Sequence, residues 1–189
     1  MAKKLVILDR DGVINKVRDE YVSSIEHFKF ETNAVSALKK LISKRYSVCV
    51  CSNQQGVAKK IIDIKLLHSL ENIVNKALKS DETDTNSKIK FLYCTHLAVE
   101  NCLCRKPKAG LLEQALELEN IKVADAIFVG DNITDYYAAQ NIKMDFALVL
   151  TGHGLKFRSL LCGKVPIYSD LNEFVNHYIA KDGKTDNVD

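Results

Sequence analysis

The sequence contains no apolar run long enough to cross a membrane, no apolar leader segment and no strong excess of charge of either sign. A membrane-spanning helix needs about 20 apolar residues in succession, and no run approaches that length. Residues Met1 to Lys4 lead directly into a short apolar run, without the apolar region of a secretory signal. The formal net charge of +3 is too small to indicate the concentrated basic face of a nucleic-acid-binding protein. We therefore expect a cytoplasmic protein with no membrane or nucleic-acid partner, and we expect a monomer.

The sequence also lacks an internal repeat and an interdomain linker. Its 189 residues, of which 47% are hydrophobic and 27% are charged, suffice for one globular domain with a sizeable core. We expect this domain over residues 1–180 and a polar C-terminal tail over residues 181–189. The polar segment from Ser80 to Lys88 is expected to be a surface loop. Little length remains for a second domain, so we expect a minimal cap or none and an open site built from loops.

Short apolar runs alternate with segments of helical spacing along the chain. This alternation predicts an α/β fold of Rossmann type, in which a mostly parallel sheet carries helices on both faces. Right-handed crossovers then place the loops that follow the strands at one edge of the sheet. We expect strands at residues 4–9, 47–51, 89–94, 126–130 and 145–150, and helices at residues 34–44, 63–79, 109–119, 133–141 and 170–180.

Two aspartates, Asp9 and Asp11, and then Gly12 follow the first apolar run. Two carboxylates this close repel each other unless a cation joins them. At the carboxyl edge of a sheet, where α/β proteins bind ligands, they indicate Mg²⁺ and a carboxylate free to attack phosphorus. An aspartate at a strand end also serves as a turn or helix cap, so the pair alone leaves both interpretations open.

Three further loops reach the same expected edge. Ser52 and Asn53 follow the second apolar run, where a hydroxyl and a backbone N–H suit a phosphate oxygen or form an ordinary turn. Arg105 and Lys106 are adjacent cations before a proline, suited to an anion or to a surface salt bridge. After the fourth run, Asp131 can complete a metal site, while Asp135 either supports that site or caps the following helix.

A second cluster consists of cysteines and one histidine. In a cytosolic chain, such a cluster favours a metal over disulfides. It offers three thiolates and one imidazole, the full tetrahedral set of a closed zinc site. With no open coordination position, this Zn²⁺ is expected to be structural and to fix the loop that presents Arg105 and Lys106. The expected ligands are Cys94, His96, Cys102 and Cys104.

The order of these motifs, each at a strand end, resembles the haloacid dehalogenase superfamily of phosphotransferases over nearly the whole chain. The resemblance implies that Asp9 is the nucleophile and Asp11 the general acid/base. It implies that Ser52 and Lys106 hold the transferring phosphoryl group. It also implies a Mg²⁺ site formed by Asp9, the backbone carbonyl of Asp11, and Asp131.

The zinc loop and the segment Arg105-Lys106-Pro107 resemble two groups within that superfamily, the D-glycero-D-manno-heptose 1,7-bisphosphate 7-phosphatases and the histidinol-phosphate phosphatases. The first motif, residues 9–15, and the late segment Thr151-Gly152-His153-Gly154 look like the heptose group. This resemblance implies removal of the 7-phosphate of a small sugar bisphosphate, in nucleotide-activated heptose biosynthesis for lipopolysaccharide or another surface polysaccharide. Arg105, with Asn53 and Lys106, is then expected to contact the substrate, because a bidentate arginine suits the second phosphate.

Two positions depart from the heptose group. Ser52 stands where threonine is common, and Asn132 stands where a cation is expected. These departures put the substrate in doubt more than the reaction. Histidinol phosphate or another phosphate monoester stays open as the substrate, as does a zinc-stabilised binding protein whose phosphatase site has decayed. A polynucleotide phosphatase is less favoured, because no basic stretch is interleaved with aromatic residues.

Overall fold

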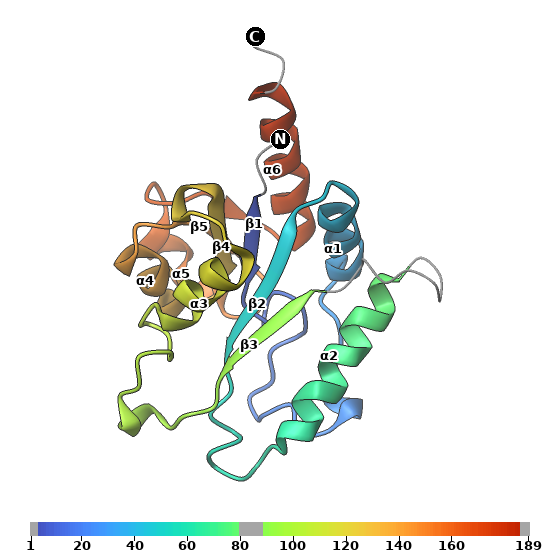
Figure 1. The fold of residues 1–189 in the computed structure, drawn as a ribbon, viewed down its shortest axis with the longest axis vertical. Coiled ribbons are helices and arrows are strands. Elements are labelled where there is room, and N and C mark those ends of the chain that lie inside the picture. Colours follow the sequence, from blue (N-terminus) through green and yellow to red (C-terminus); the bar gives the residue numbers. More distant parts are fainter. Residues whose placement is uncertain (1–3, 80–88, 186–189) are drawn as a thin grey trace.

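A computed structural model describes residues 4–79 and 89–185. Its strands form one six-stranded sheet in the order β3-β2-β1-β4-β5-β6, and all neighbouring strands pair in parallel (Figure 1). This confirms the predicted parallel α/β fold. The strands are β1 (Leu5–Leu8), β2 (Ser47–Asn53), β3 (Lys90–Cys94), β4 (Ala126–Gly130), β5 (Asp145–Val149) and β6 (Ile167–Tyr168).

Helices cover both faces of the sheet. Figure 1 shows α1, α2 and α6 on one side and α3, α4 and α5 on the other. The side chains of strand β1 alternate between the two faces of the sheet, and all of them are buried. Both faces must therefore be covered. Val6 and Leu8 pack with α1, α2 and α6, whereas Leu5 and Ile7 pack with the other three helices. The helices are α1 (Ala34–Ser43), α2 (Ile64–Leu78), α3 (Gly110–Glu119), α4 (Ile133–Asn141), α5 (Gly154–Leu161) and α6 (Leu171–Thr185).

The strand order determines where a ligand can bind. The chain builds β1, β2 and β3 in one direction and then returns to place β4 on the other side of β1. The crevice outside the carboxyl ends of β1 and β4 is therefore the topological switch point, where open α/β sheets bind ligands. Asp9 follows β1 and Asp131 follows β4, so both reach this crevice.

Some elements differ from their predicted bounds. Helix α6 was expected to end at residue 180 but continues to Thr185, so residues 181–185 of the expected tail are helical. Asp182 explains the extension, because its carboxylate pairs with the Lys4 ammonium and accepts a hydrogen bond from the Tyr46 hydroxyl. The sequence did not indicate α5 or β6. The expected loop at 80–88 and residues 186–189 lie outside the described residues. Among the described helices, none has the length and apolar character needed to cross a bilayer.

Candidate active site

Three carboxylates meet at the switch point. Asp9, Asp131 and Asp135 each offer an oxygen, and these oxygens lie within 4.8 Å of one another. Asp131 follows β4, and Asp135 lies in the first turn of α4, where it is completely buried. Buried carboxylates at this spacing repel one another strongly unless cations neutralise them. The sheet edge therefore holds a concentrated negative charge.

One cation of the chain lies among these carboxylates. The Lys106 ammonium is 2.9 Å from Asp9 Oδ1 and 2.7 Å from Asp135 Oδ1, and it donates to the Cys51 carbonyl at 3.0 Å. Burial lowers the pKa of Lys106, but Asp135 and Asp9 raise it more, so the pKa lies above its ordinary value. Lys106 is therefore charged, and it leaves the three-carboxylate cluster with a net negative charge.

The pKa values of the carboxylates show the same excess of negative charge. Burial raises the pKa of Asp131 to about 8, and the charges of Asp9 and Asp135 add to this effect. Burial also raises the pKa of Asp9 to about 6, against the opposing attraction of Lys106. A divalent cation would remove this repulsion, and carboxylate oxygens are the ligands that Mg²⁺ prefers. The residues present thus fit a magnesium ion.

Asp11 lies apart from this cluster. Arg10 Nη2 donates to its Oδ1 at 3.0 Å and to its Oδ2 at 2.9 Å, while Asn15 and Gln54 each donate one hydrogen bond at 2.9 Å. Burial raises the pKa of Asp11, but Arg10 and these hydrogen bonds outweigh it and hold the pKa below its usual value. Side-chain donors therefore occupy both carboxylate oxygens of Asp11, and its backbone carbonyl stays the predicted metal ligand.

Ser52 and Asn53 end strand β2 beside this cluster. Ser52 is buried, and its Oγ accepts a hydrogen bond from Gln54 Nε2 at 3.0 Å. The Asn53 side chain donates to the Lys106 carbonyl and accepts from the Lys106 N–H, both at 3.1 Å. Asn53 therefore fixes the main chain that presents Lys106, a role the sequence did not indicate. Its contact with substrate stays a prediction, as does that of the half-buried Arg105.

Helix α4 begins with a reciprocal cap. Asn132 Oδ1 accepts from the Thr134 N–H at 3.2 Å, and Asp135 Oδ2 accepts from the Asn132 N–H at 3.1 Å. Asp135 thus caps the helix with one oxygen and pairs with Lys106 through the other. Asp135 therefore caps the helix and also lies in the carboxylate cluster, so the two roles that the sequence leaves open do not exclude each other. Asn132, which departs from the expected cation, has a capping role of its own.

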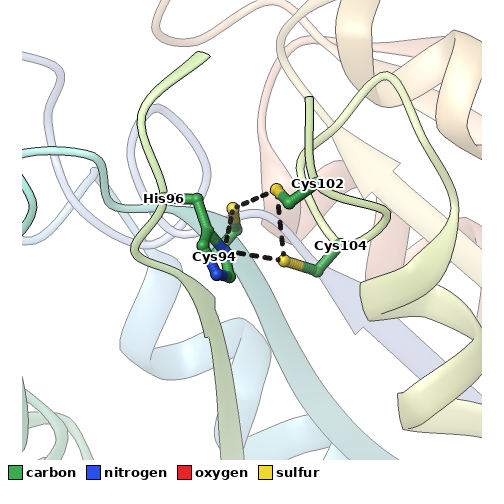
Figure 2. A group of neighbouring side chains, drawn as sticks. All are labelled: Cys94, His96, Cys102 and Cys104. Atoms are coloured by element: carbon green, nitrogen blue, oxygen red, sulfur yellow. Dashed lines mark hydrogen bonds between the residues drawn. The ribbon is translucent and has the colours of Figure 1, made fainter. Parts of the chain in front are cut away.

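Cys94, His96, Cys102 and Cys104 converge beside the end of β3 (Figure 2). The Sγ atoms of Cys94 and Cys102 are 3.5 Å apart, as are those of Cys102 and Cys104. His96 Nδ1 lies 3.6 Å from Cys94 Sγ and 3.3 Å from Cys104 Sγ. Zn–S bonds of about 2.3 Å in a tetrahedron imply ligand separations of roughly 3.7 Å. The four residues therefore have nearly the spacing that zinc requires, and zinc binding stays a prediction.

This cluster leads to a measurable metal content. We expect protein purified without chelator to contain about one zinc per chain by elemental analysis, because four ligands would complete a closed tetrahedral site. Cys104→Ala should lose most of this zinc and lower the midpoint of thermal unfolding. Cys162→Ala, which removes an exposed thiol, should leave both quantities unchanged. If wild-type protein contained no zinc, and if added zinc did not raise its midpoint of thermal unfolding, the assignment of a zinc site would be wrong.

Comparisons with known proteins agree with this geometry. A family model described as polynucleotide kinase 3 phosphatase matches residues 4–151. The D-glycero-beta-D-manno-heptose-1,7-bisphosphate 7-phosphatase of Neisseria meningitidis is 30% identical over 190 residues, which cover 98% of this chain and 100% of the relative. The D-glycero-alpha-D-manno-heptose-1,7-bisphosphate 7-phosphatase of Campylobacter jejuni is 31% identical over 191 residues, which cover 96% and 99%.

A solved structure resembles the whole fold. The crystal structure of D,D-heptose 1,7-bisphosphate phosphatase from B. bronchiseptica, complexed with magnesium and phosphate, superimposes with a TM-score of 0.84 at 27% sequence identity. The match covers 94% of this chain and 99% of that chain. The two relatives therefore match this chain in length, and the solved structure matches it in length and in fold.

Proposed function

This chain belongs to the polynucleotide kinase 3 phosphatase family of haloacid dehalogenase phosphatases, and we propose that it removes the 7-phosphate of D-glycero-D-manno-heptose 1,7-bisphosphate. It is a phosphoric monoester hydrolase. The substrate proposal is supported by relatives with this activity that match over their full length. The observation that carries the chemistry is the meeting of Asp9, Lys106 and Asp131 at the switch point of the sheet.

Asp9 is the proposed nucleophile. One of its oxygens attacks the phosphorus, and the bond from phosphorus to the sugar oxygen breaks to leave an aspartyl phosphate. The Lys106 ammonium, 2.9 Å from Asp9 Oδ1, reduces the repulsion between the carboxylate and the phosphate dianion. Mg²⁺ held by Asp9, the Asp11 carbonyl and Asp131 would neutralise further negative charge on the phosphoryl oxygens.

Asp11 is the proposed acid and base. The lowered pKa of Asp11 makes it an ionised carboxylate at neutral pH, so it must take up a proton from solvent as the substrate binds. It then gives this proton to the departing sugar oxygen and takes one from the water that hydrolyses the aspartyl phosphate. Its four hydrogen bonds from Arg10, Asn15 and Gln54 occupy both carboxylate oxygens. The leaving oxygen must therefore replace one of these donors when the proton moves.

Several finer assignments follow from the same proposal. Ser52 holds a phosphoryl oxygen, and Arg105 contacts the second phosphate, for which a bidentate cation is suited. The product would serve nucleotide-activated heptose biosynthesis for lipopolysaccharide or another surface polysaccharide. We place the enzyme in the cytoplasm, where the zinc-site thiols stay reduced. We also propose a monomer, since one chain supplies every residue of the site.

A comparison of substrates tests the proposal. We expect the highest kcat/KM, in the presence of Mg²⁺, for one anomer of heptose 1,7-bisphosphate. Both anomers must be assayed, because one relative is named for the beta anomer and another for the alpha anomer. The panel includes histidinol phosphate and a 3′-phosphorylated oligonucleotide, with phosphate release as the measurement. A tenfold preference for either of these two would overturn the proposed substrate. No release from any of them, or from an aryl phosphate, would indicate a decayed site.

A further inference from the structure

The loop that follows β5, residues 151–154, contacts the active site through two of its residues. The Thr151 hydroxyl donates to the Gly12 carbonyl at 2.6 Å. The His153 N–H donates to Asp131 Oδ2 at 2.7 Å. The loop after β5 thus contacts both Asp131, a predicted metal ligand, and Gly12, the residue that follows Asp11. The chemistry proposed above assigns no task to this loop.

Glycine residues allow these contacts. Gly152 has a φ of +57°, and a Cβ there would lie 2.6 Å from Gly12 Cα and would also collide with Asp131 Oδ2. Gly12 has a φ of +88°, and a Cβ there would lie 2.5 Å from Asp131 Cγ. Two glycines from different loops therefore pack against the same carboxylate, and neither position has space for a side chain.

The loop also makes contacts where it joins α5. The Gly154 N–H donates to the Thr151 carbonyl at 2.9 Å, which closes a turn immediately before α5. A Cβ at Gly154 would lie 2.8 Å from the Val149 carbonyl carbon at the end of β5. A turn that is packed between the end of β5 and the start of α5 holds its hydrogen-bond donors in fixed positions. It can therefore fix the groups that accept from them, the Gly12 carbonyl and the Asp131 carboxylate.

We propose that loop 151–154 is a positioning element of the magnesium site, in which Thr151 fixes the Gly12 carbonyl and the His153 N–H fixes the rotation of the Asp131 carboxylate. The bond to Oδ2 determines where Oδ1 points. The bond to Gly12 determines the path of the main chain that carries the Asp11 carbonyl. Partners that orient metal ligands typically contribute about 10- to 100-fold in metal affinity. This inference rests on the proposed metal site.

A matched pair of glycine variants tests the proposal by direct titration of the protein with Mn²⁺, followed by electron paramagnetic resonance. Gly152→Ala and Gly163→Ala both place an alanine at positive φ, but a Cβ at Gly163, where φ is +75°, meets no atom within 4 Å. We expect Gly152→Ala to weaken Mn²⁺ binding by about 10-fold or more. Gly163→Ala should change it by less than about twofold.

A second pair tests one hydrogen bond without adding bulk. Thr151→Val removes the hydroxyl and should weaken Mn²⁺ binding by about 10-fold, whereas Thr151→Ser keeps the hydroxyl and should bind Mn²⁺ with the wild-type affinity. Thr151→Val leaves the Gly12 carbonyl without this donor and should lower the thermal unfolding midpoint, so Mn²⁺ affinity is compared at a temperature at which every variant is folded. Equal Mn²⁺ affinity in Gly152→Ala, Thr151→Val and wild type would overturn the positioning role.

Asp131→Asn separates this inference from the proposed function. Loss of tight Mn²⁺ binding in Asp131→Asn, with unchanged affinity in both loop variants, would reject only the role of loop 151–154. Unchanged Mn²⁺ binding in Asp131→Asn would instead reject the proposed metal site, and the positioning role with it.

Discussion

We expect Asp9→Asn to lower kcat by at least about 10⁴-fold, which corresponds to about 5.4 kcal/mol of activation free energy. The amide is a poor nucleophile and cannot form the aspartyl phosphate. The fold should survive, because burial already disfavours the ionised form of Asp9, as its pKa raised to about 6 shows. Lys106 also keeps its ion pair with Asp135 at 2.7 Å, so a neutral side chain at position 9 should change the free energy of unfolding little at neutral pH.

The measurement combines steady-state phosphate release with rapid acid quenching of the phosphorylated enzyme. Wild-type protein should yield a phosphorylated peptide containing Asp9, and Asp9→Asn should yield none. Asp145→Asn removes an exposed carboxylate at the start of β5 and serves as the matched control. Phosphatase activity in Asp9→Asn near the wild-type value would show that Asp9 is not the nucleophile.

We expect Lys106→Met to affect both catalysis and stability. Its ammonium lies between Asp9 and Asp135, at 2.9 and 2.7 Å. Removing one partner of a buried ion pair costs about 3–5 kcal/mol of stability. Loss of a cation that stabilises the transferring phosphoryl group should also lower kcat/KM by about 10²- to 10³-fold. Urea unfolding and phosphate release measure the two effects separately.

The control for Lys106→Met is Lys122→Met, which removes the same charge from an exposed position. It should change neither the free energy of unfolding nor kcat/KM appreciably. If Lys106→Met resembled Lys122→Met in both measurements, Lys106 would have no part in holding the phosphoryl group or the carboxylates.

Most of the fold could be predicted because its strands are short apolar runs. The buried run Leu5–Leu8 and the run Ala126–Gly130 form strands within one residue of their expected limits. The sequence pattern does not indicate strand β6, because this strand has only two residues, Ile167 and Tyr168, and is defined by its pairing with β5. Helix α6 extends past its expected end because Asp182 makes contacts with Lys4 and Tyr46 that are distant in sequence.

The site shows a similar division. The positions of Asp9 and Asp131 at strand ends are enough to predict that the two residues lie close together, because parallel strands place their carboxyl ends at one edge of the sheet. The sequence did not reveal that Arg10, Asn15 and Gln54 hold the Asp11 carboxylate. Arginine, asparagine and glutamine are ordinary turn or surface residues by type, and their burial, at 1%, 0% and 3% exposed, follows from tertiary packing. Their one sequence signal was proximity to Asp11 and Ser52.

We expect this enzyme to cleave the phosphate at C7 of a heptose 1,7-bisphosphate and to leave the phosphate at C1. The ³¹P spectrum of the reaction tests it directly, because the 7-phosphate couples to two methylene protons and the 1-phosphate couples to one anomeric proton. With wild-type enzyme and Mg²⁺, we predict that the triplet disappears, the doublet remains and inorganic phosphate appears. Loss of the doublet first, or an unchanged spectrum under conditions in which the enzyme hydrolyses another phosphate monoester, would contradict the claim.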